Sequence, residues 1–490
     1  MKEKLKNKKK IINLIIIFII SLIIFIPWLK VHYSVDNYTI ENYGYQYYSE
    51  KWSLLGGRLI MYLILNFANL IRLPVQPFIV ISEIISIFIS SVNVIILKSI
   101  IESERKTKSI KEEIMLTVIT YITIFNFMFI DCMQYVECTV MSLSIMCYLI
   151  AAKTLVEKKK GYIFQSAFLV LLGVLCYQGT ICMFFAFTTL LSIIKNKKDL
   201  KKIIIDIIKC GLISFIIILI NLAFVSIVGK VIDKKQKRIN GLSQIQSNLQ
   251  YIIKNFTVIL SDTCNLFPKN LFALSLISLT IITLLVALKN KYDKSLLINY
   301  LILILVSILG TYVFFIMTLS SFYTGRMRVS IGALIGLIFI YWYINDLFEN
   351  KIAEIIICIL LVIYTVVTIY FYEVIMIDQV KINNLEKQDV VEIEKYIENY
   401  ENDNNIKIEY VIEVNNTKKT EKAFYSGIKT INPSALRHAE IATSVINVYT
   451  GRKLQYKGIT NIGENTFDEE FHEQGYICKG NTLYIEIYIS

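Results

Sequence analysis

Proline, histidine and charged residues are all scarce in this chain. Of its 490 residues only 5 are proline and 3 are histidine, and 18% are charged while 55% are hydrophobic. His32, His438 and His472 are widely separated, and the 9 cysteines show no CxxC spacing or His pairing, so we expect no histidine-based zinc centre. The chain also lacks a glycine-rich phosphate-binding loop, so no nucleotide site is expected.

Long apolar runs take the place of those missing residues. The mean hydropathy is +0.56, which is too apolar for a soluble protein of this size. The runs are roughly 20 residues long, about what a helix needs to cross ~30 Å of hydrocarbon, and only helices satisfy their own backbone hydrogen bonds there. We therefore predict an all-α polytopic membrane protein. About eleven spans are expected, near 11–28, 76–97, 114–130, 138–155, 161–176, 179–194, 210–229, 271–288, 295–317, 329–345 and 352–372.

Lysine and arginine are concentrated in short segments on one side of these spans, which predicts a cytoplasmic N-terminus. The first run follows a basic start, but no small-residue cleavage site comes after it, so we interpret it as an uncleaved span. Eleven spans then place the C-terminus outside the cytoplasm, in a multi-pass protein of the cell membrane. The net charge of +12 is accordingly a topology signal and not a sign of nucleic-acid binding.

The composition changes after residue 372, which predicts two domains. Residues 1–372 would form the membrane catalytic domain, and residues 373–490 a small extracytoplasmic α/β domain. Asn383 to Lys387 is interpreted as a polar linker. After it we expect a helix at Asp389–Tyr400, a strand at Ile406–Val414, a helix at Pro433–Val448 and a strand at Thr482–Ile489.

The segment after the first span carries the strongest functional pattern. Asp36 and Asn37 are followed by a run of tyrosines that begins at Tyr38, then by Trp52, and the segment ends on Gly-Gly-Arg at Arg58. A carboxylate can act as a base, aromatic rings can stack on sugars, and a guanidinium can bind phosphate. Aromatic residues also anchor membrane interfaces, so part of this cluster has that simpler explanation.

Two shorter outer turns hold further polar candidates. The turn between the third and fourth spans contains Asp131, Tyr135 and Glu137, and Tyr177–Gln178 forms the turn between the fifth and sixth. A solvated turn or interhelical hydrogen bonding would account for these residues without any chemistry. A carboxylate at the mouth of a helical bundle is nevertheless costly unless it has a function, so we keep all five as candidates.

Several cations are expected on the outer side despite the general bias towards the cytoplasm. They are Arg58, Arg326, Arg328, Lys235 and Arg238. Contact with anionic headgroups is one explanation. The alternative is capture of a lipid phosphate, because the guanidinium offers a two-pronged set of donors and always stays charged.

Together these motifs resemble a known family. Asp36-Asn37 followed by Gly57-Arg58, Tyr135-Val136-Glu137, Tyr177-Gln178 and the late Arg326 resemble the polytopic serotype-converting glucosyltransferases of the Gtr type II family, in the GT-C superfamily. The resemblance extends over residues 30 to 345. It implies a polyprenyl-phosphate sugar donor and a glycan acceptor outside the cytoplasm. The family usually has paired Asp where this chain has Asp36-Asn37, and Asp where it has Glu137, so a divalent metal stays an open question.

The predicted function is therefore an inverting membrane glycosyltransferase that moves a hexose, with glucose expected, to a cell-envelope glycan. Asp36 and Glu137 are the predicted catalytic carboxylates, with Asp36 as the base. The five cations would bind the donor phosphate. Asn37, Tyr38, Trp52, Asp131, Tyr135, Tyr177 and Gln178 are predicted to contact acceptor or sugar. Two alternatives stay open. One is a transporter or flippase of lipid-linked sugars, for which charged or broken helices at the bilayer midplane would be typical. The other is an O-antigen-type polymerase or ligase.

Overall fold

The computed structural model describes most of the chain: residues 2–30, 32–197, 199–232, 245–254, 262–289, 294–315, 324–345, 351–415, 434–461, 471 and 474–487. By its internal packing the chain divides into two units. The first comprises Met1–Phe25, Ser49–Leu65 and Ile81–Tyr372. The second comprises Ile26–Tyr48, Asn66–Val80 and Glu373–Ser490. The sequence prediction did not place the two early segments with the C-terminal part.

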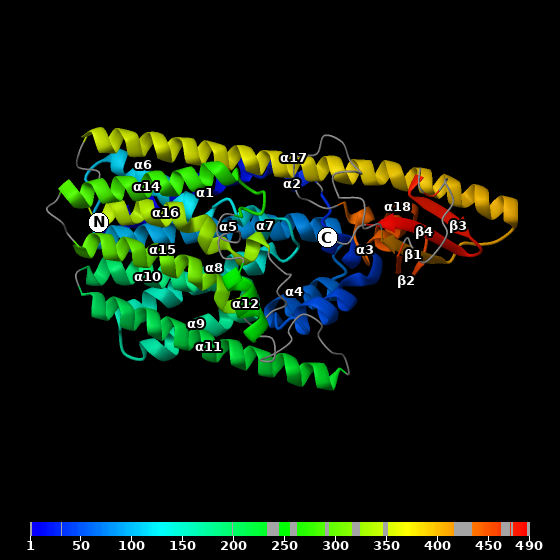
Figure 1. Ribbon diagram of the computed structural model, residues 1–490, viewed down its shortest axis with the longest axis horizontal. Coiled ribbons are helices and arrows are strands. Elements are labelled where there is room, and N and C mark those ends of the chain that lie inside the picture. The colour runs from blue at the N-terminus through cyan, green and yellow to red at the C-terminus, as the bar shows by residue number, and fades with distance from the viewer. Residues whose placement is uncertain are drawn as a thin grey trace. The chain divides into compact units, whose positions relative to one another are not determined.

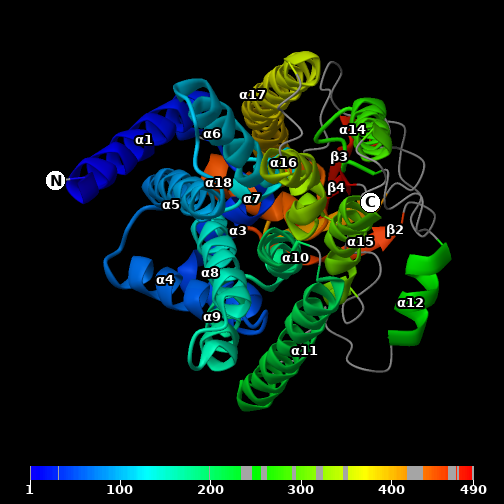
Figure 2. The same cartoon turned by 90° about the vertical axis from the view of Figure 1, so that its left-hand side faces the viewer.

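The first unit is built of helices that run side by side (Figure 1), and Figure 2 looks along many of them. Its elements include α1 (Lys2–Ile24), η1 (Ser49–Leu54), α6 (Ile110–Ile124), α7 (Phe129–Met133), α8 (Cys138–Glu157), α9 (Tyr162–Cys176), η2 (Gln178–Ile181), α10 (Cys182–Asn196), α11 (Leu200–Val231), α12 (Ile245–Lys254), α14 (Lys269–Lys289), α15 (Lys294–Phe315), η4 (Gly325–Met327) and α16 (Val329–Ile344). Along the chain, α4 (Leu59–Leu70), α5 (Val75–Glu104) and α17 (Lys351–Asn404) pass from one unit into the other.

Helix α10 is the centre of this unit. It packs against α8, α11, α15 and α16, and its apolar side chains are almost all buried. Glycines allow another close contact, between α16 and α6. A Cβ at Gly332 or Gly336 would collide with Asn126 or Thr123, so only the missing side chain lets the two backbones approach.

The predicted membrane character is confirmed in its general form. Six of the described helices are long and apolar enough to cross a membrane, or seven if the bent pair Lys8–Ile24 and Ile26–Leu54 forms one span. Each of the eleven predicted runs contains helix, but Tyr162–Cys176, Lys269–Leu285 and Val329–Ile344 are shorter apolar helices. The structure therefore does not establish a count of eleven spans.

The second unit combines early helices with a C-terminal sheet. It contains α2 (Ile26–Lys30), α3 (Val35–Tyr48), β1 (Tyr410–Asn415), η6 (Ala435–Arg437), α18 (Ala442–Thr450), β2 (Gln455–Asn461), β3 (Tyr476–Lys479) and β4 (Thr482–Ile487). The strand order is β2-β1-β4-β3, with β1 parallel to both neighbours and β3 antiparallel to β4. Helix α18 packs against α3. The small C-terminal sheet predicted from alternating residues is thus present.

The apolar core of this unit joins residues from distant parts of the chain. Val390, Ile393 and Ile397 of α17 share one apolar cluster with Val411 of β1. The rings of Tyr33 and Tyr38 belong to the same cluster. Residues 383–387 do not form the predicted linker, since they lie inside the continuous helix α17. Asn383 supports that helix by accepting from the Tyr33 N–H at 2.8 Å and donating to the Tyr33 carbonyl at 3.0 Å.

Helix was also found where the sequence suggested an outer loop between the first two spans. Residues 35–48 form α3, 49–54 form η1 and 59–70 form α4. The tyrosine run has no clear apolar period, which hid the helix. Gly44 interrupts α3 with a φ of 85°, a conformation that glycine adopts without strain.

Candidate functional site

Arg58 lies at the end of a tight turn in the first unit. The turn follows η1, and Gly57 has a φ of +73°, in the left-handed region that favours glycine. The Arg58 N–H donates to the Ser53 carbonyl at 2.8 Å, and α4 begins at the next residue. The Arg58 guanidinium forms an ion pair with Glu137 and lies over the Tyr177 ring, 4.6 Å from its centroid. The structure thus brings together residues from three predicted turns.

Glu137 directly precedes α8 and is 2% exposed. An isolated buried carboxylate is strongly destabilising, so the ion pair with Arg58 accounts for its presence there. Its Oε2 faces Arg58, while Oε1 has no hydrogen-bond partner among the residues that the structure describes. That second oxygen is a buried acceptor whose hydrogen-bonding capacity is unused within the described part of the chain.

A second cation is held beside the first. Asp131 of α7 accepts a hydrogen bond from the Arg326 backbone N–H at 2.8 Å, which fixes the η4 turn on α7. The Arg326 guanidinium then lies over the Tyr135 ring at 3.9 Å from its centroid.

Tyr177 links the surroundings of the two arginines. Its ring lies under the Arg58 guanidinium, and η2 begins at the next residue. The η4 turn, which carries Arg326, packs against both α7 and η2. Two guanidinium groups, each over an aromatic ring, therefore lie in one corner of the first unit.

Arg328 has a different environment, although it is only two residues away. Its side chain is buried, and it donates to Asp262 Oδ2 at 3.1 Å and to Cys264 Sγ at 3.4 Å. The Arg328 side chain is only 1% exposed, so it is better suited to holding the fold than to reaching a substrate. The other predicted cations, Lys235 and Arg238, lie outside the described residues.

Gln178 is buried and engaged with the protein. Its Nε2 donates to the Gly56 carbonyl and, at 3.2 Å, to Oδ1 of Asn221 in α11. Sequence reasoning did not select Asn221, which lies inside the predicted span 210–229. An amide within an otherwise apolar run was the one signal that could have found it.

Three of the predicted residues lie in the second unit. Asp36 is the second residue of α3 and is partly exposed. Asn37 and Tyr38 are buried, and the Tyr38 hydroxyl donates to Glu386 at 2.9 Å and lies 2.7 Å from the Tyr449 hydroxyl. In this conformation Asn37 and Tyr38 present no surface on which a sugar could bind.

Trp52 belongs to η1 of the first unit. Its ring is partly exposed and lies below the Lys51 amine, 4.9 Å from it. The sugar-stacking role of Trp52 stays a prediction.

Among the described residues, no three His, Cys, Asp or Glu side chains gather in a way that could hold an ion. The predicted acids Asp131 and Glu137 are each bound to an arginine turn.

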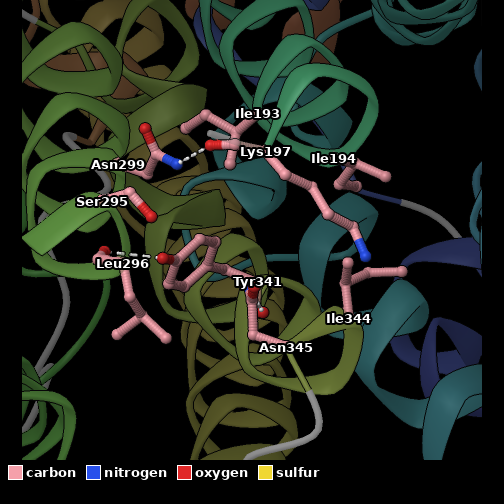
Figure 3. Close-up of a pocket in the computed structure, with 9 residues that line it drawn as sticks. All are labelled: Ile193, Ile194, Lys197, Ser295, Leu296, Asn299, Tyr341, Ile344 and Asn345. Carbon is pink, nitrogen blue, oxygen red and sulfur yellow. Dashed lines mark hydrogen bonds between the residues drawn. The ribbon is translucent and has the colours of Figure 1, made fainter. Parts of the chain in front are cut away.

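A cavity of about 70 Å³ lies elsewhere in the first unit, and Figure 3 shows its lining. It opens beside Lys197 at the end of α10, whereas η2 precedes the start of that helix, so roughly 22 Å of helix lies between them at 1.5 Å per residue. Its lining residues are Ile193, Ile194, Lys197, Ser295, Leu296, Asn299, Tyr341, Ile344 and Asn345. None of them is a predicted site residue.

The sequence profile of a family described as "Glucosyl transferase GtrII" matches residues 25–343. The chain belongs to this GtrII family. It is a glycosyltransferase, as the motifs predicted. No curated protein and no solved structure was found to match it.

The GtrII match covers the site described above. Arg58, Glu137, Tyr177 and Arg326 all lie inside the matched range, and so does Asp36. The C-terminal sheet of the second unit begins at Tyr410 and lies beyond it. The corner formed by α7, η2, η4 and the Arg58 turn is therefore the candidate active site of this GtrII family member.

Proposed function

We propose that this GtrII family member is an inverting glycosyltransferase of the cell membrane. It transfers a hexose, with glucose expected, from a polyprenyl-phosphate donor to a glycan of the cell envelope outside the cytoplasm. The observation that supports this most is the pair of guanidinium groups, Arg58 over Tyr177 and Arg326 over Tyr135, in one corner of the first unit. Arginine binds phosphate oxygens through paired donors and stays charged at every relevant pH.

The arginines stabilise the leaving group in this proposal. As the bond between the anomeric carbon and the phosphate oxygen breaks, its electron pair stays on the phosphate, which gains negative charge. Arg58 and Arg326 are positioned to compensate that charge, and Arg58 directly precedes α4, whose positive end adds to the favourable field. Glu137 holds Arg58 through Oε2 and offers Oε1 to the acceptor or to the developing oxocarbenium ion.

Asp36 is the proposed general base. It takes the proton from the acceptor hydroxyl while the hydroxyl oxygen forms the new bond to the anomeric carbon, opposite the departing phosphate. The support comes from a comparison of the contacts that the three candidate acids make. Asp131 and Glu137 are each committed to an arginine turn, whereas Asp36 forms no ion pair within the described part of the chain.

The test of this proposal is transfer in a reconstituted membrane. Full-length protein in lipid vesicles would receive polyprenyl-phosphate glucose and a cell-envelope glycan, and the labelled product would be separated and its anomeric configuration determined. Arg58→Ala should raise the KM for the donor. The matched control is Arg452→Ala, which removes an arginine paired with Glu394 and Glu401 outside the family match and should leave the KM unchanged. Transfer that is equally fast in Arg58→Ala would refute the phosphate-binding role.

One observation favours the alternative of a transporter of lipid-linked sugars. Glu83 is 1% exposed in α5, a helix long and apolar enough to cross a membrane, and ionisable groups inside spans are typical of transport pathways. Glu83→Gln separates the two functions. If it abolishes movement of the lipid-linked sugar across the vesicle bilayer while sugar transfer to the glycan continues, transport is a second function of the chain.

The proposal includes a topology, with the N-terminus in the cytoplasm and the C-terminus outside. A reporter fused after Ser490 should be active only outside the cytoplasm. Cytoplasmic activity of that reporter would mean an even number of spans, and the short helices α9, α14 and α16 would be the first to reconsider.

A further inference from the structure

Asn221 occupies a position where a polar side chain needs a reason. It lies in α11, is 3% exposed, and is surrounded in sequence by isoleucine, leucine and alanine. An amide buried in an apolar helix is costly unless its donors and acceptors are paired. Asn221 Nδ2 donates to the Gly57 carbonyl at 2.9 Å, and Oδ1 accepts from Gln178 Nε2 at 3.2 Å. One end of the amide therefore holds the turn before Arg58, and the other end is bound by Gln178.

Gln178 completes the same arrangement. Its Nε2 also donates to the Gly56 carbonyl, so two consecutive carbonyls of the turn are held by two side-chain amides. A Cβ on Gly57 would lie 2.5 Å from Asn221 Oδ1 and 2.8 Å from Gln178 Nε2. Position 57 thus requires glycine for its φ of +73° and also for the closeness of the amides. We call Gln178 and Asn221 the amide clamp.

The clamp acts on the residue that follows it. Tyr177, next to Gln178 in the chain, lies beneath the Arg58 guanidinium, while Gln178 itself holds the backbone just before Arg58. The same short segment therefore fixes both the start and the end of the arginine side chain. Phosphate recognition by a two-pronged group depends on its direction, and a misplacement of about 1 Å can cost on the order of 100-fold in rate.

We propose that Asn221 and Gln178 are positioning residues of the transfer reaction, which hold the Gly56–Gly57 turn so that Arg58 faces the donor phosphate. This inference rests on the phosphate-binding role of Arg58 proposed above. The clamp residues act through Arg58 and not on the reacting atoms.

Double variants with Arg58→Ala distinguish a positioning role from general destabilisation, because a residue that acts only through Arg58 has no further effect once Arg58 is gone. Asn221→Leu and Gln178→Leu keep the side-chain volume approximately and remove the amides. Each should raise the donor KM by about 10-fold or more in the wild-type background. In the Arg58→Ala background neither should cause a further increase, because the residue they position is gone.

Asn299→Leu is the matched control for these variants. Asn299 Nδ2 also donates to a backbone carbonyl, that of Lys197 at 2.6 Å, beside the cavity in Figure 3 at the far end of α10. Its loss should not change the donor KM. An equal increase in Asn299→Leu, or effects of Asn221→Leu and Arg58→Ala that multiply, would overturn the clamp while leaving the role of Arg58 intact. Wild-type donor kinetics in Arg58→Ala would refute both proposals together.

A second measurement needs no sugar transfer. In Arg58→Cys, the rate at which a water-soluble thiosulfonate modifies the thiol at residue 58 would be followed by mass spectrometry of that peptide. Adding Asn221→Leu or Gly57→Ala should increase the rate by about 10-fold, since the released turn opens more often. Equal rates with and without the clamp would overturn the inference, even if one of the variants were too unstable for kinetics.

Discussion

Glu137 in the first unit and Glu386 in the second are both buried acids, but their partners differ. In the first unit Glu137 is paired with a cation, Arg58, above an aromatic ring. In the second unit Glu386 is also fully buried, but its partners are neutral: the Tyr38 and Ser434 hydroxyls, each at 2.9 Å, together with an amide and a backbone N–H. Glu413 of β1 likewise accepts from a backbone N–H, that of Glu440 at 2.6 Å.

The difference indicates which polar groups serve chemistry and which serve folding. At Glu386 neutral donors occupy both carboxylate oxygens and leave neither of them for a ligand. An arginine bound through one carboxylate oxygen still has further N–H donors in its fork, and these can turn to an incoming phosphate. The first unit therefore contains the groups suited to an anionic substrate, and the buried network of the second unit is suited to stability.

The largest expected effect is at Asp36. This proposed base belongs to the second unit, so it tests whether only the first unit contributes groups to the chemistry. Asp36→Asn keeps the size of the side chain and removes its basicity, so sugar transfer should fall by a factor on the order of 10²–10⁴ while donor binding persists. The measurement is transfer rate and donor KM in vesicles. If Asp36→Asn transfers at nearly the wild-type rate and Glu137→Gln is inactive, then Glu137 is the base. Wild-type transfer in both variants would mean that neither carboxylate is the base.

A smaller effect is expected at Arg58, within the first unit. Arg58→Ala removes charge-assisted hydrogen bonds worth about 1.5–3 kcal/mol, so the donor should bind roughly 10- to 100-fold more weakly. Arg58→Lys keeps the charge that neutralises Glu137 and loses only the paired geometry, so it should be milder. Donor KM and thermal stability should be measured side by side. A Lys variant as impaired as the Ala variant would show that geometry, not charge, dominates.

Much of this comparison could be predicted from the sequence. Arg58, Glu137, Tyr177 and Arg326 all lie in polar segments between long apolar runs, so they were recognisable as candidates. Each of the eleven apolar runs contains helix, and strands were expected where β1 and β4 lie. Whether a short helix such as α9 crosses a membrane depends on its tilt and neighbours, which a pattern of apolar residues does not specify.

Tertiary partners were what the sequence could not provide. Tyr38 is indistinguishable from a sugar-stacking tyrosine until Glu386, far along the chain, is seen to bind its hydroxyl. Asn221 was similarly hidden in an apolar run, because its partners are the carbonyl of Gly57 and the amide of Gln178. The strands β2 and β3 were missed since β2 alternates in exposure without a buried face and β3 has only four residues.

Arg326 and Arg328 are two residues apart, and we expect moderate effects that differ in kind: one on donor binding and one on stability. Arg326→Lys should raise the donor KM by a few-fold, since its guanidinium faces Tyr135 in the candidate site. Arg328→Lys should mainly lower thermal stability, because it disturbs the buried contacts with Asp262 and Cys264. Kinetics and melting curves of both variants would show the separation. The reverse pattern would assign the phosphate to Arg328.

The smallest expected effect on transfer is at Glu413, where the change should appear in stability. Burial raises the pKa of Glu413 from its ordinary 4.5 to about 8, and the nearby Glu440 carboxylate adds to the shift. Between these values the folded state holds a proton that the unfolded state has lost, so stability is greatest at low pH and falls as pH rises towards 8.

Glu413→Gln cannot ionise, but its side-chain oxygen can still accept from the Glu440 N–H. Hydrogen exchange of β1 and β4 from pH 5 to 9, corrected for the intrinsic rate, should therefore show protection falling in the wild type and staying level in the variant. Parallel profiles would mean that the pKa of Glu413 is not raised in the folded protein, and that neutral donors alone do not keep this buried acid protonated.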